Sequence, residues 1–130
     1  MGKERALVID DSRTVAAVVQ HYLQLAGFEV FVAADGVAGL ETAQRECPQV
    51  IVTDLNLPGM GGLDMIKALR ADERTRHISI CMLTSDESPE TAMLARQIGA
   101  DDYILKPVTP QGLAARVRAV MDRGEEAAHG

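Results

Sequence analysis

The chain has 130 residues, 47% of them hydrophobic and 25% charged, with a formal net charge of −6. A chain of this length forms one domain that buries about two thirds of its unfolded surface and needs no disulfide staple. The acidic balance excludes a basic surface for direct nucleic-acid binding, and no apolar run approaches the ~20 residues that insert into a membrane.

The N-terminal segment and the cysteines indicate a cytoplasmic location. The apolar run after the charged residues Lys3, Glu4 and Arg5 is too short for the hydrophobic region of a signal peptide. Cys47 and Cys81 have no CxxC or metal-ligand spacing, so we expect both to be reduced thiols in the core.

Short apolar runs, rich in β-branched residues, predict five β-strands. In chain order the expected strands cover 6–9, 28–32, 50–54, 78–83 and 103–105. The third run stops at Asp54 and is followed by Pro58 and three glycines within ten residues. This pattern is typical of a buried strand that ends in a loop.

Apolar residues recur every three to four positions between the strands, which predicts five amphipathic helices. The expected helices cover about 13–26, 36–47, 63–71, 89–98 and 110–123. Ser12 and Thr109 are placed to cap the first and last helix, and Gly27 and Gly99 to stop the first and fourth. The expected buried faces include Val18, Val37, Met93 and Leu94.

Strands that alternate with helices need crossover connections, which produce a parallel sheet with helices on both faces. We therefore expect an α/β, doubly wound, three-layer fold with a five-stranded parallel sheet and five helices. For the strand order we adopt 2-1-3-4-5, the flavodoxin-like solution for this arrangement. The domain is expected to span residues 1–123, followed by a flexible tail at 124–130.

Reactive polar side chains follow four of the predicted strands. Asp10 and Asp11 follow the first strand, Asp54 the third, Thr84 the fourth and Lys106 the fifth. In an open α/β sheet these strand ends meet at one crevice, where ligands bind. Each residue alone is more often a helix cap or a solvated loop residue, but the five together indicate a functional site.

Carboxylates gathered in one crevice favour a bound cation. At 5 Å and an effective dielectric constant near 20, each pair repels by about 3 kcal/mol. Oxygen ligands without a nearby His or Cys favour Mg²⁺. The expected ligands are the carboxylates of Asp10, Asp11 and Asp54 and the backbone carbonyl of Asn56.

A carboxylate beside a metal, an ammonium group and a hydroxyl can accept a phosphoryl group as a nucleophile. Asp54 is the central candidate for this acceptor. Thr84 would donate a hydrogen bond to one phosphoryl oxygen, and Lys106 would pair with another.

Four motifs in the chain form a highly specific combination. They are Val-Ile-Asp-Asp-Ser at 8–12, Val-Thr-Asp-Leu-Asn-Leu-Pro-Gly-Met-Gly-Gly-Leu-Asp at 52–64, Leu-Thr-Ser at 83–85 and Gly-Ala-Asp-Asp-Tyr-Ile-Leu-Lys-Pro at 99–107. With these motifs the chain resembles the receiver domains of two-component response regulators, of the stand-alone chemotaxis-regulator (CheY-like) type. The resemblance covers almost the whole chain.

This resemblance implies a phosphorylation switch. A sensor histidine kinase or phosphotransfer protein would phosphorylate Asp54 with Mg²⁺, and the domain would assist its own phosphorylation and dephosphorylation without being an enzyme. Thr84 would be drawn toward the phosphoryl group and Tyr103 would move inward. The face formed by the fourth helix, fifth strand and fifth helix would then change and control a downstream protein. The Lys106–Pro107 peptide is expected to be cis.

In the same family, residues two positions after the acceptor and two after the threonine tune the lifetime of the phosphoryl group. In this chain these are Asn56 and Asp86. Both side chains can orient water, so we expect fairly rapid self-dephosphorylation. The protein is expected to be a monomer or a weak dimer.

Two alternatives remain open at the level of sequence, and a third is disfavoured. An Asp nucleophile with Mg²⁺ also describes phosphatases of the haloacid-dehalogenase type, although these have a second Asp where this chain has Asn56. A pure interaction module would need an incomplete site, whereas all five residue types are present in this chain. The chain leaves no room for an output domain, so its output passes through a partner, or else these residues come from a larger regulator or hybrid kinase.

Overall fold

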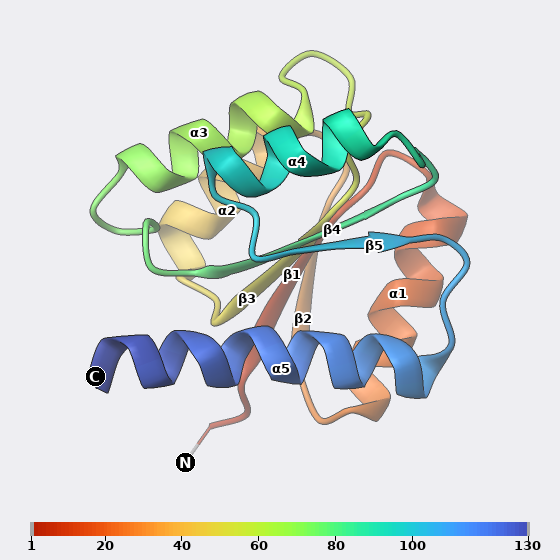
Figure 1. Cartoon of the computed structure of the whole chain (residues 1–130). Helices are drawn as coiled ribbons and strands as arrows, with labels where there is room; N and C mark the ends of the chain where they lie inside the picture. The colour runs from red at the N-terminus through yellow and green to blue at the C-terminus, as the bar shows by residue number, and fades with distance from the viewer. Residues whose placement is uncertain (1, 130) are drawn as a thin grey trace.

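The computed structural model describes the backbone of residues 2–129 and the side chains of residues 2–124. Within this part of the chain, strands and helices alternate from beginning to end (Figure 1). The strands are β1 (Arg5–Ile9), β2 (Glu29–Ala33), β3 (Val50–Thr53), β4 (Ser79–Thr84) and β5 (Asp102–Leu105). The helices are α1 (Arg13–Leu25), α2 (Gly36–Glu46), α3 (Gly62–Ala71), α4 (Pro89–Ile98) and α5 (Pro110–His129).

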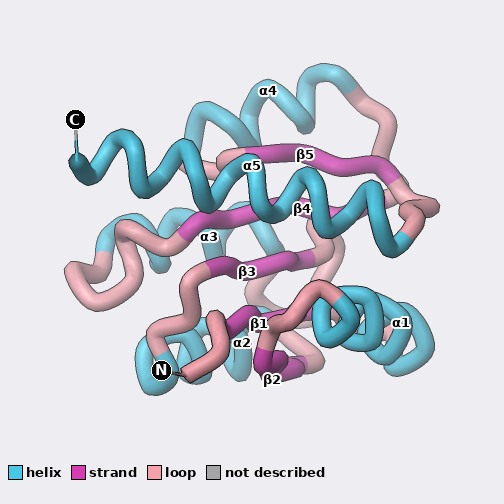
Figure 2. Tube along the Cα trace, turned by 90° about the horizontal axis from the view of Figure 1, so that it is seen from below, coloured by secondary structure: helices cyan, strands magenta, loops and turns pink. Residues whose placement is uncertain are grey.

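All neighbouring strands are parallel, in the order β2-β1-β3-β4-β5 (Figure 2). Helices α1 and α5 cover one face of the sheet, and α2, α3 and α4 cover the other (Figure 1). The predicted doubly wound fold and its strand order are therefore confirmed. The carboxyl ends of β1, β3, β4 and β5 come together at one edge of the sheet.

The alternation of side chains along β1 shows how the two layers of core are filled. Leu7 and Ile9 pack in the cluster formed with α2, α3 and α4, whereas Ala6 and Val8 pack in the cluster formed with α1 and α5. Every residue of β3 and β4 is buried. Continuous burial is what a parallel sheet covered on both faces requires.

The predicted helix caps and stops are present. The Ser12 hydroxyl accepts a hydrogen bond at 3.2 Å from the N–H three residues later, and the Thr109 hydroxyl accepts the equivalent bond at 2.9 Å. Gly27 and Gly99 follow their helices with φ angles of 100° and 129°. Glycine adopts the left-handed conformation at little cost, which makes it the commonest residue to end a helix in this way.

Some apolar residues expected on the buried faces of the helices are exposed, so that part of the prediction is wrong. They are Val18, Val37, Met93 and Leu94, with exposed fractions of 43%, 50%, 61% and 45%. Small residues take the contact positions on α2 and α4, where Gly39 and Ala95 are buried. On α1, Ala16 is buried together with the expected Val19 and Leu23. Small side chains let a helix approach the sheet closely, which turns its flanking apolar residues outward.

The two cysteines differ in environment. Cys81 is buried in β4 as expected, and burial raises the pKa of its thiol to about 12. Cys47 is exposed, so its predicted place in the core is wrong. It follows α2 in the left-handed conformation, with φ 45° and ψ 60°, which takes it off the helical path.

The last helix is longer than expected. It begins at Pro110 as predicted but continues to His129, so the segment expected to be a tail from residue 124 has a helical backbone up to that residue. The sequence Glu-Glu-Ala-Ala at 125–128 explains the extension, because these are strong helix formers and one glycine costs only about 1 kcal/mol. Even so, no helix within residues 2–129 combines the length and hydropathy needed to cross a bilayer.

Asp102 joins β5 to the helices on either side of it. The residue is only 7% exposed. It accepts hydrogen bonds from Arg116 of α5 at 2.7 and 2.8 Å and from Arg96 of α4 at 3.3 Å. The backbone N–H of Tyr103 donates a further bond at 2.8 Å.

This network predicts a loss of stability in acid. The Arg116 hydrogen bonds hold the pKa of the Asp102 carboxyl below its ordinary value. The unfolded chain therefore binds the proton more readily, so the stabilisation is complete above about pH 4 and is lost as the pH falls toward the folded pKa.

We expect Asp102→Asn to lower the free energy of unfolding at neutral pH by about 1–2 kcal/mol, a figure that allows for the half-exposed arginines. The substitution should also flatten the decline in stability below about pH 4. Urea unfolding across the acid range measures both, with Asp122→Asn, an exposed acid on α5, as the control. An unchanged decline in Asp102→Asn would contradict the assignment.

Candidate functional site

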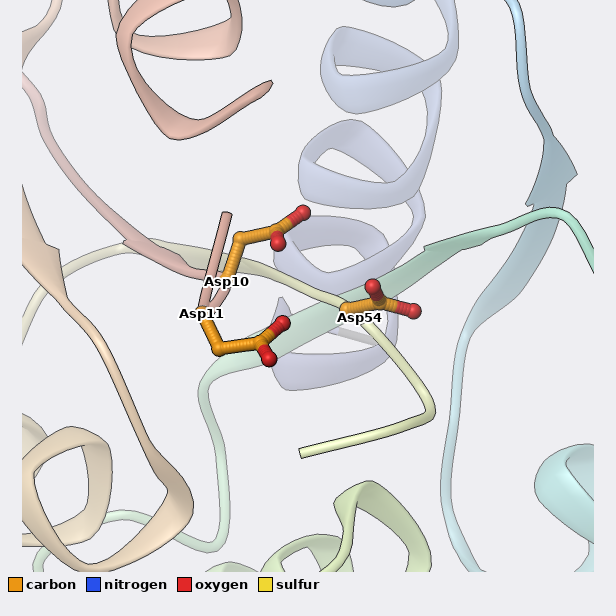
Figure 3. Close-up of side chains that lie close together, drawn as sticks. All are labelled: Asp10, Asp11 and Asp54. Atoms are coloured by element: carbon orange, nitrogen blue, oxygen red, sulfur yellow. The ribbon is translucent and has the colours of Figure 1, made fainter. Parts of the chain in front are cut away.

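Three carboxylates meet at the carboxyl edge of the sheet (Figure 3). Asp10 and Asp11 follow β1, and Asp54 directly follows β3, which lies beside β1. One oxygen from each carboxylate lies within 4.8 Å of the others. The Asp54 N–H donates to the Ile9 carbonyl at 2.9 Å, which continues the β1–β3 pairing up to the site.

Lys106 brings a positive charge into this cluster. It follows β5, and its Nζ lies 3.2 Å from Asp10 Oδ2 and 3.3 Å from Asp54 Oδ2. Its backbone N–H donates to the Thr84 carbonyl at 2.9 Å, so β4 fixes its position, and the peptide bond to Pro107 is cis. The ammonium group offsets part of the repulsion between the two carboxylates.

Backbone N–H groups orient the same two carboxylates. Ser12 donates to Asp10 Oδ1 at 2.9 Å, and Leu55 donates to Asp54 Oδ1 at 2.7 Å. In both carboxylates one oxygen is held by the backbone and the other by Lys106. The N–H of Ser12 was missed by sequence reasoning, although an Asp that accepts from the residue two positions later is a common turn pattern.

The donor set fits a hard divalent cation. The candidate ligands are carboxylate oxygens, and their three negative charges exceed the single charge of Lys106. Mg²⁺ prefers such oxygen ligands and keeps several of its waters, which suits a site open on one side. Asn56, whose carbonyl was expected to contribute, lies exposed in the loop that follows Asp54.

Thr84 and Tyr103 are linked through the backbone of Asp86. Thr84 ends β4 and is 1% exposed, and its hydroxyl oxygen accepts from the Asp86 N–H at 3.2 Å. The Tyr103 hydroxyl donates to the Asp86 carbonyl at 2.8 Å, and Tyr103 as a whole residue is 8% exposed, so its ring occupies the inward position. Burial raises the pKa of Tyr103, and the charges of Asp86 and Asp54 add to the effect.

The Asp86 side chain has a structural contact that the sequence did not reveal. Its Oδ1 accepts from the Ser88 N–H at 2.8 Å, just before α4, while the Ser88 hydroxyl caps that helix. One oxygen of Asp86 is therefore engaged in the turn.

The fold and the site together define a class: a flavodoxin-like α/β domain with an acidic pocket and a lysine at the carboxyl edge of its sheet. The chain belongs to the response regulator receiver domain family, whose model matches residues 6–118. The family consists of signalling proteins of two-component systems, which sets it apart from the haloacid-dehalogenase phosphatases.

Relatives and solved structures agree with this assignment. The chain is 36% identical over 125 residues to the alkaline phosphatase synthesis transcriptional regulatory protein PhoP of Bacillus subtilis, covering 96% of this chain and 51% of that protein. It is 38% identical over 124 residues to the DNA-binding response regulator MtrA of Mycobacterium tuberculosis, covering 95% and 53%. The chain thus spans about half the length of the curated relatives it matches.

Among solved structures, the chemotaxis response regulator CheY4 of Vibrio cholerae matches with a TM-score of 0.86 and 36% identity, over 92% of this chain and 99% of that one. A response regulator receiver domain protein from Clostridium thermocellum matches with a TM-score of 0.87 and 29% identity, over 95% and 98%. The structural resemblance therefore includes the chemotaxis-regulator type.

Proposed function

We propose that this domain is a phospho-accepting signalling switch in which Asp54 receives a phosphoryl group from a histidine kinase or a phosphotransfer protein. The observation that carries the proposal is the contact of Lys106 with both Asp10 and Asp54, beside a third carboxylate, at the carboxyl edge of the sheet. An acid that only capped a loop would not share an ammonium group with a second acid from another strand.

In the proposed transfer, an Asp54 carboxylate oxygen attacks the phosphorus of a phosphohistidine. The P–N bond breaks, its electron pair stays on the imidazole nitrogen, and Asp54 becomes an acyl phosphate. The Lys106 ammonium group would then form an ion pair with a negatively charged phosphoryl oxygen. The Thr84 hydroxyl oxygen already accepts a bond from Asp86, which leaves its proton free to donate to another phosphoryl oxygen.

Asp10, Asp11 and Asp54, with the Asn56 carbonyl, would hold Mg²⁺. When bound, the ion neutralises charge on the phosphoryl oxygens. The chain's own part is to fix the carboxylates, which it does through the N–H groups of Ser12 and Leu55.

We propose that Thr84 and Tyr103 carry the signal outward. A shift of Thr84 toward a phosphoryl group would displace Asp86, because the Asp86 N–H donates a hydrogen bond to the Thr84 hydroxyl. The Asp86 carbonyl in turn accepts the hydrogen bond that holds Tyr103 in its inward position. Tyr103 adjoins Asp102, whose ion pairs reach α4 and α5. The output face, defined as the surface of α4, β5 and α5, carries exposed apolar side chains for a downstream protein: Met93, Leu94 and Leu105.

Asn56 and Asp86 are proposed to tune the phosphoryl lifetime. Asn56 is exposed beside the acceptor and can orient a water for hydrolysis, and Asp86 would do so with the oxygen that Ser88 does not use. We expect fairly rapid self-dephosphorylation from this pair.

The same proposal includes the location of the domain, its oligomeric state and the contacts it avoids. The domain would work in the cytoplasm as a monomer or weak dimer, with no direct nucleic-acid contact and no membrane insertion. The net charge of −6 supports the absence of direct nucleic-acid contact, because it opposes binding to phosphate backbones.

Intact-mass spectrometry after incubation with a small acyl phosphate tests the proposed function. We expect a gain of one phosphoryl group that requires Mg²⁺ and disappears when EDTA is added before the donor. A protein that keeps its mass at saturating donor and Mg²⁺ would contradict the proposal. Continuous turnover of phosphomonoesters would instead indicate a phosphatase.

A further inference from the structure

The loop between β3 and α3, residues 54–61, carries both Asp54 and Asn56 and is closed on itself. The Gly62 N–H donates to the Leu55 carbonyl at 3.0 Å and so joins the two ends of the loop. Two residues of the loop itself, Leu55 and Leu57, are buried, with exposed fractions of 8% and 9%. The proposed Mg²⁺ ligands of this loop therefore belong to a small anchored unit.

This unit rests against the first residue of α2. Gly36 is buried, and a Cβ built on it would lie 2.3 Å from the Met60 carbonyl oxygen and 3.1 Å from the Met60 Cβ. The close neighbour is backbone, so no side-chain rotation could relieve the contact. Gly36 has no positive φ, unlike Gly27, Gly59 and Gly99, so its backbone conformation does not require glycine.

The two neighbouring helices approach the loop in the same way. A Cβ on Gly62, which begins α3, would lie 2.7 Å from the Asp54 carbonyl oxygen and 2.9 Å from that of Leu55. By contrast, a Cβ on Gly61, in the loop itself, would have nothing within 4 Å. The tight approaches therefore lie where α2 and α3 begin and not throughout this glycine-rich segment.

We propose that Gly36 is a positioning residue for the proposed Mg²⁺ site. The backbone at the start of α2 limits how far the Met60 carbonyl can move toward the helix, and so sets the position in which the loop holds Asp54 and Asn56. A methyl group at position 36 must push the loop by several tenths of an ångström or more. The loop is closed and anchored, so the displacement passes to its other members. Metal ligation tolerates little displacement, because Mg²⁺ demands near-ideal octahedral geometry. This inference rests on the proposed function.

Calorimetric titration of the unphosphorylated protein with Mg²⁺ tests the proposal without any phosphoryl transfer. We expect Gly36→Ala to raise the Kd for Mg²⁺ about fivefold, equivalent to about 1 kcal/mol. Gly61→Ala is the matched control in the loop: its φ of −68° suits alanine and its Cβ meets open space, so its Kd should equal that of the wild type.

Ala43→Gly controls for stability alone. It lies buried on the same helix and weakens α2 without adding an atom near Met60, so it should lower the melting temperature and leave the Kd unchanged. If Gly36→Ala does not fold, Met60→Gly takes its place. A more flexible loop backbone opposite Gly36 should also raise the Kd for Mg²⁺.

The outcomes separate the two proposals. A wild-type Kd in Gly36→Ala, or in Met60→Gly where that variant is used, overturns the positioning role while the proposed function stands. An equal rise in Ala43→Gly also overturns it, because the effect would then come from general destabilisation. A wild-type protein that binds no Mg²⁺ and accepts no phosphoryl group overturns both.

Discussion

Asp54→Asn is expected to abolish phosphorylation and to leave the fold intact. The amide has nearly the shape of the carboxylate but is not nucleophilic toward phosphorus. Its oxygen can still accept the Leu55 N–H, which Asp54 Oδ1 now accepts at 2.7 Å. The substitution removes one of three clustered negative charges and one partner of Lys106, and these two changes oppose each other in the free energy of unfolding.

Intact mass and circular dichroism check this expectation together. After incubation with acyl phosphate and Mg²⁺, the variant should keep its unmodified mass, while its spectrum matches that of the wild type. Asp64→Asn, an exposed acid in the first turn of α3, is the control and should be phosphorylated normally. A phosphoryl gain in Asp54→Asn equal to that of the wild type would place the acceptor on another residue.

Lys106→Met is expected to separate metal binding from phosphoryl transfer. The ammonium group contacts Asp10 and Asp54 at 3.2 and 3.3 Å, so it would compete with Mg²⁺ for these two carboxylates. Without it, the Kd for Mg²⁺ should fall about tenfold, equivalent to about 1.4 kcal/mol. The phosphorylation rate at saturating Mg²⁺ should nevertheless fall by about 10²-fold, because a charge that stabilises the transferred group is lost.

Calorimetry gives the Kd for Mg²⁺, and the time course of the mass change gives the rate. Lys67→Met removes a positive charge from an exposed position on α3 and is the control. The Kd for Mg²⁺ and the phosphorylation rate should change only by the small amount that any loss of one surface charge causes. If Lys106→Met accepted the phosphoryl group as fast as the wild type, the lysine would have only a structural part in the site.

Much of the fold could be predicted because its signals are local. The runs at 6–9 and 50–54, the periodic segments between strands, and the caps at Ser12 and Thr109 each depend on a few adjacent residues. The parallel arrangement follows from the alternation of strands and helices. The strand order came from precedent for the architecture, and the observed pairing of β1 with β2 and β3 agrees with it.

Burial was predicted less well, because it depends on how closely each helix approaches the sheet. Periodicity locates an apolar face but does not say which residue of that face meets the core. Ala95 fills that place on α4 and leaves Met93 exposed. Cys47 lies outside the core because α2 ends at Glu46 and Cys47 itself has a left-handed backbone conformation.

The sequence by itself determined which reactive side chains stand at the ends of the strands, because a strand ends where its apolar run stops. The tertiary structure alone decided how those side chains meet. Lys106 reaches Asp10 and Asp54 across 96 and 52 residues of chain, and Gly36 at the start of α2 meets Met60 in the loop between β3 and α3. Contacts between distant segments depend on the register and separation of packed elements, which no local pattern of residues encodes.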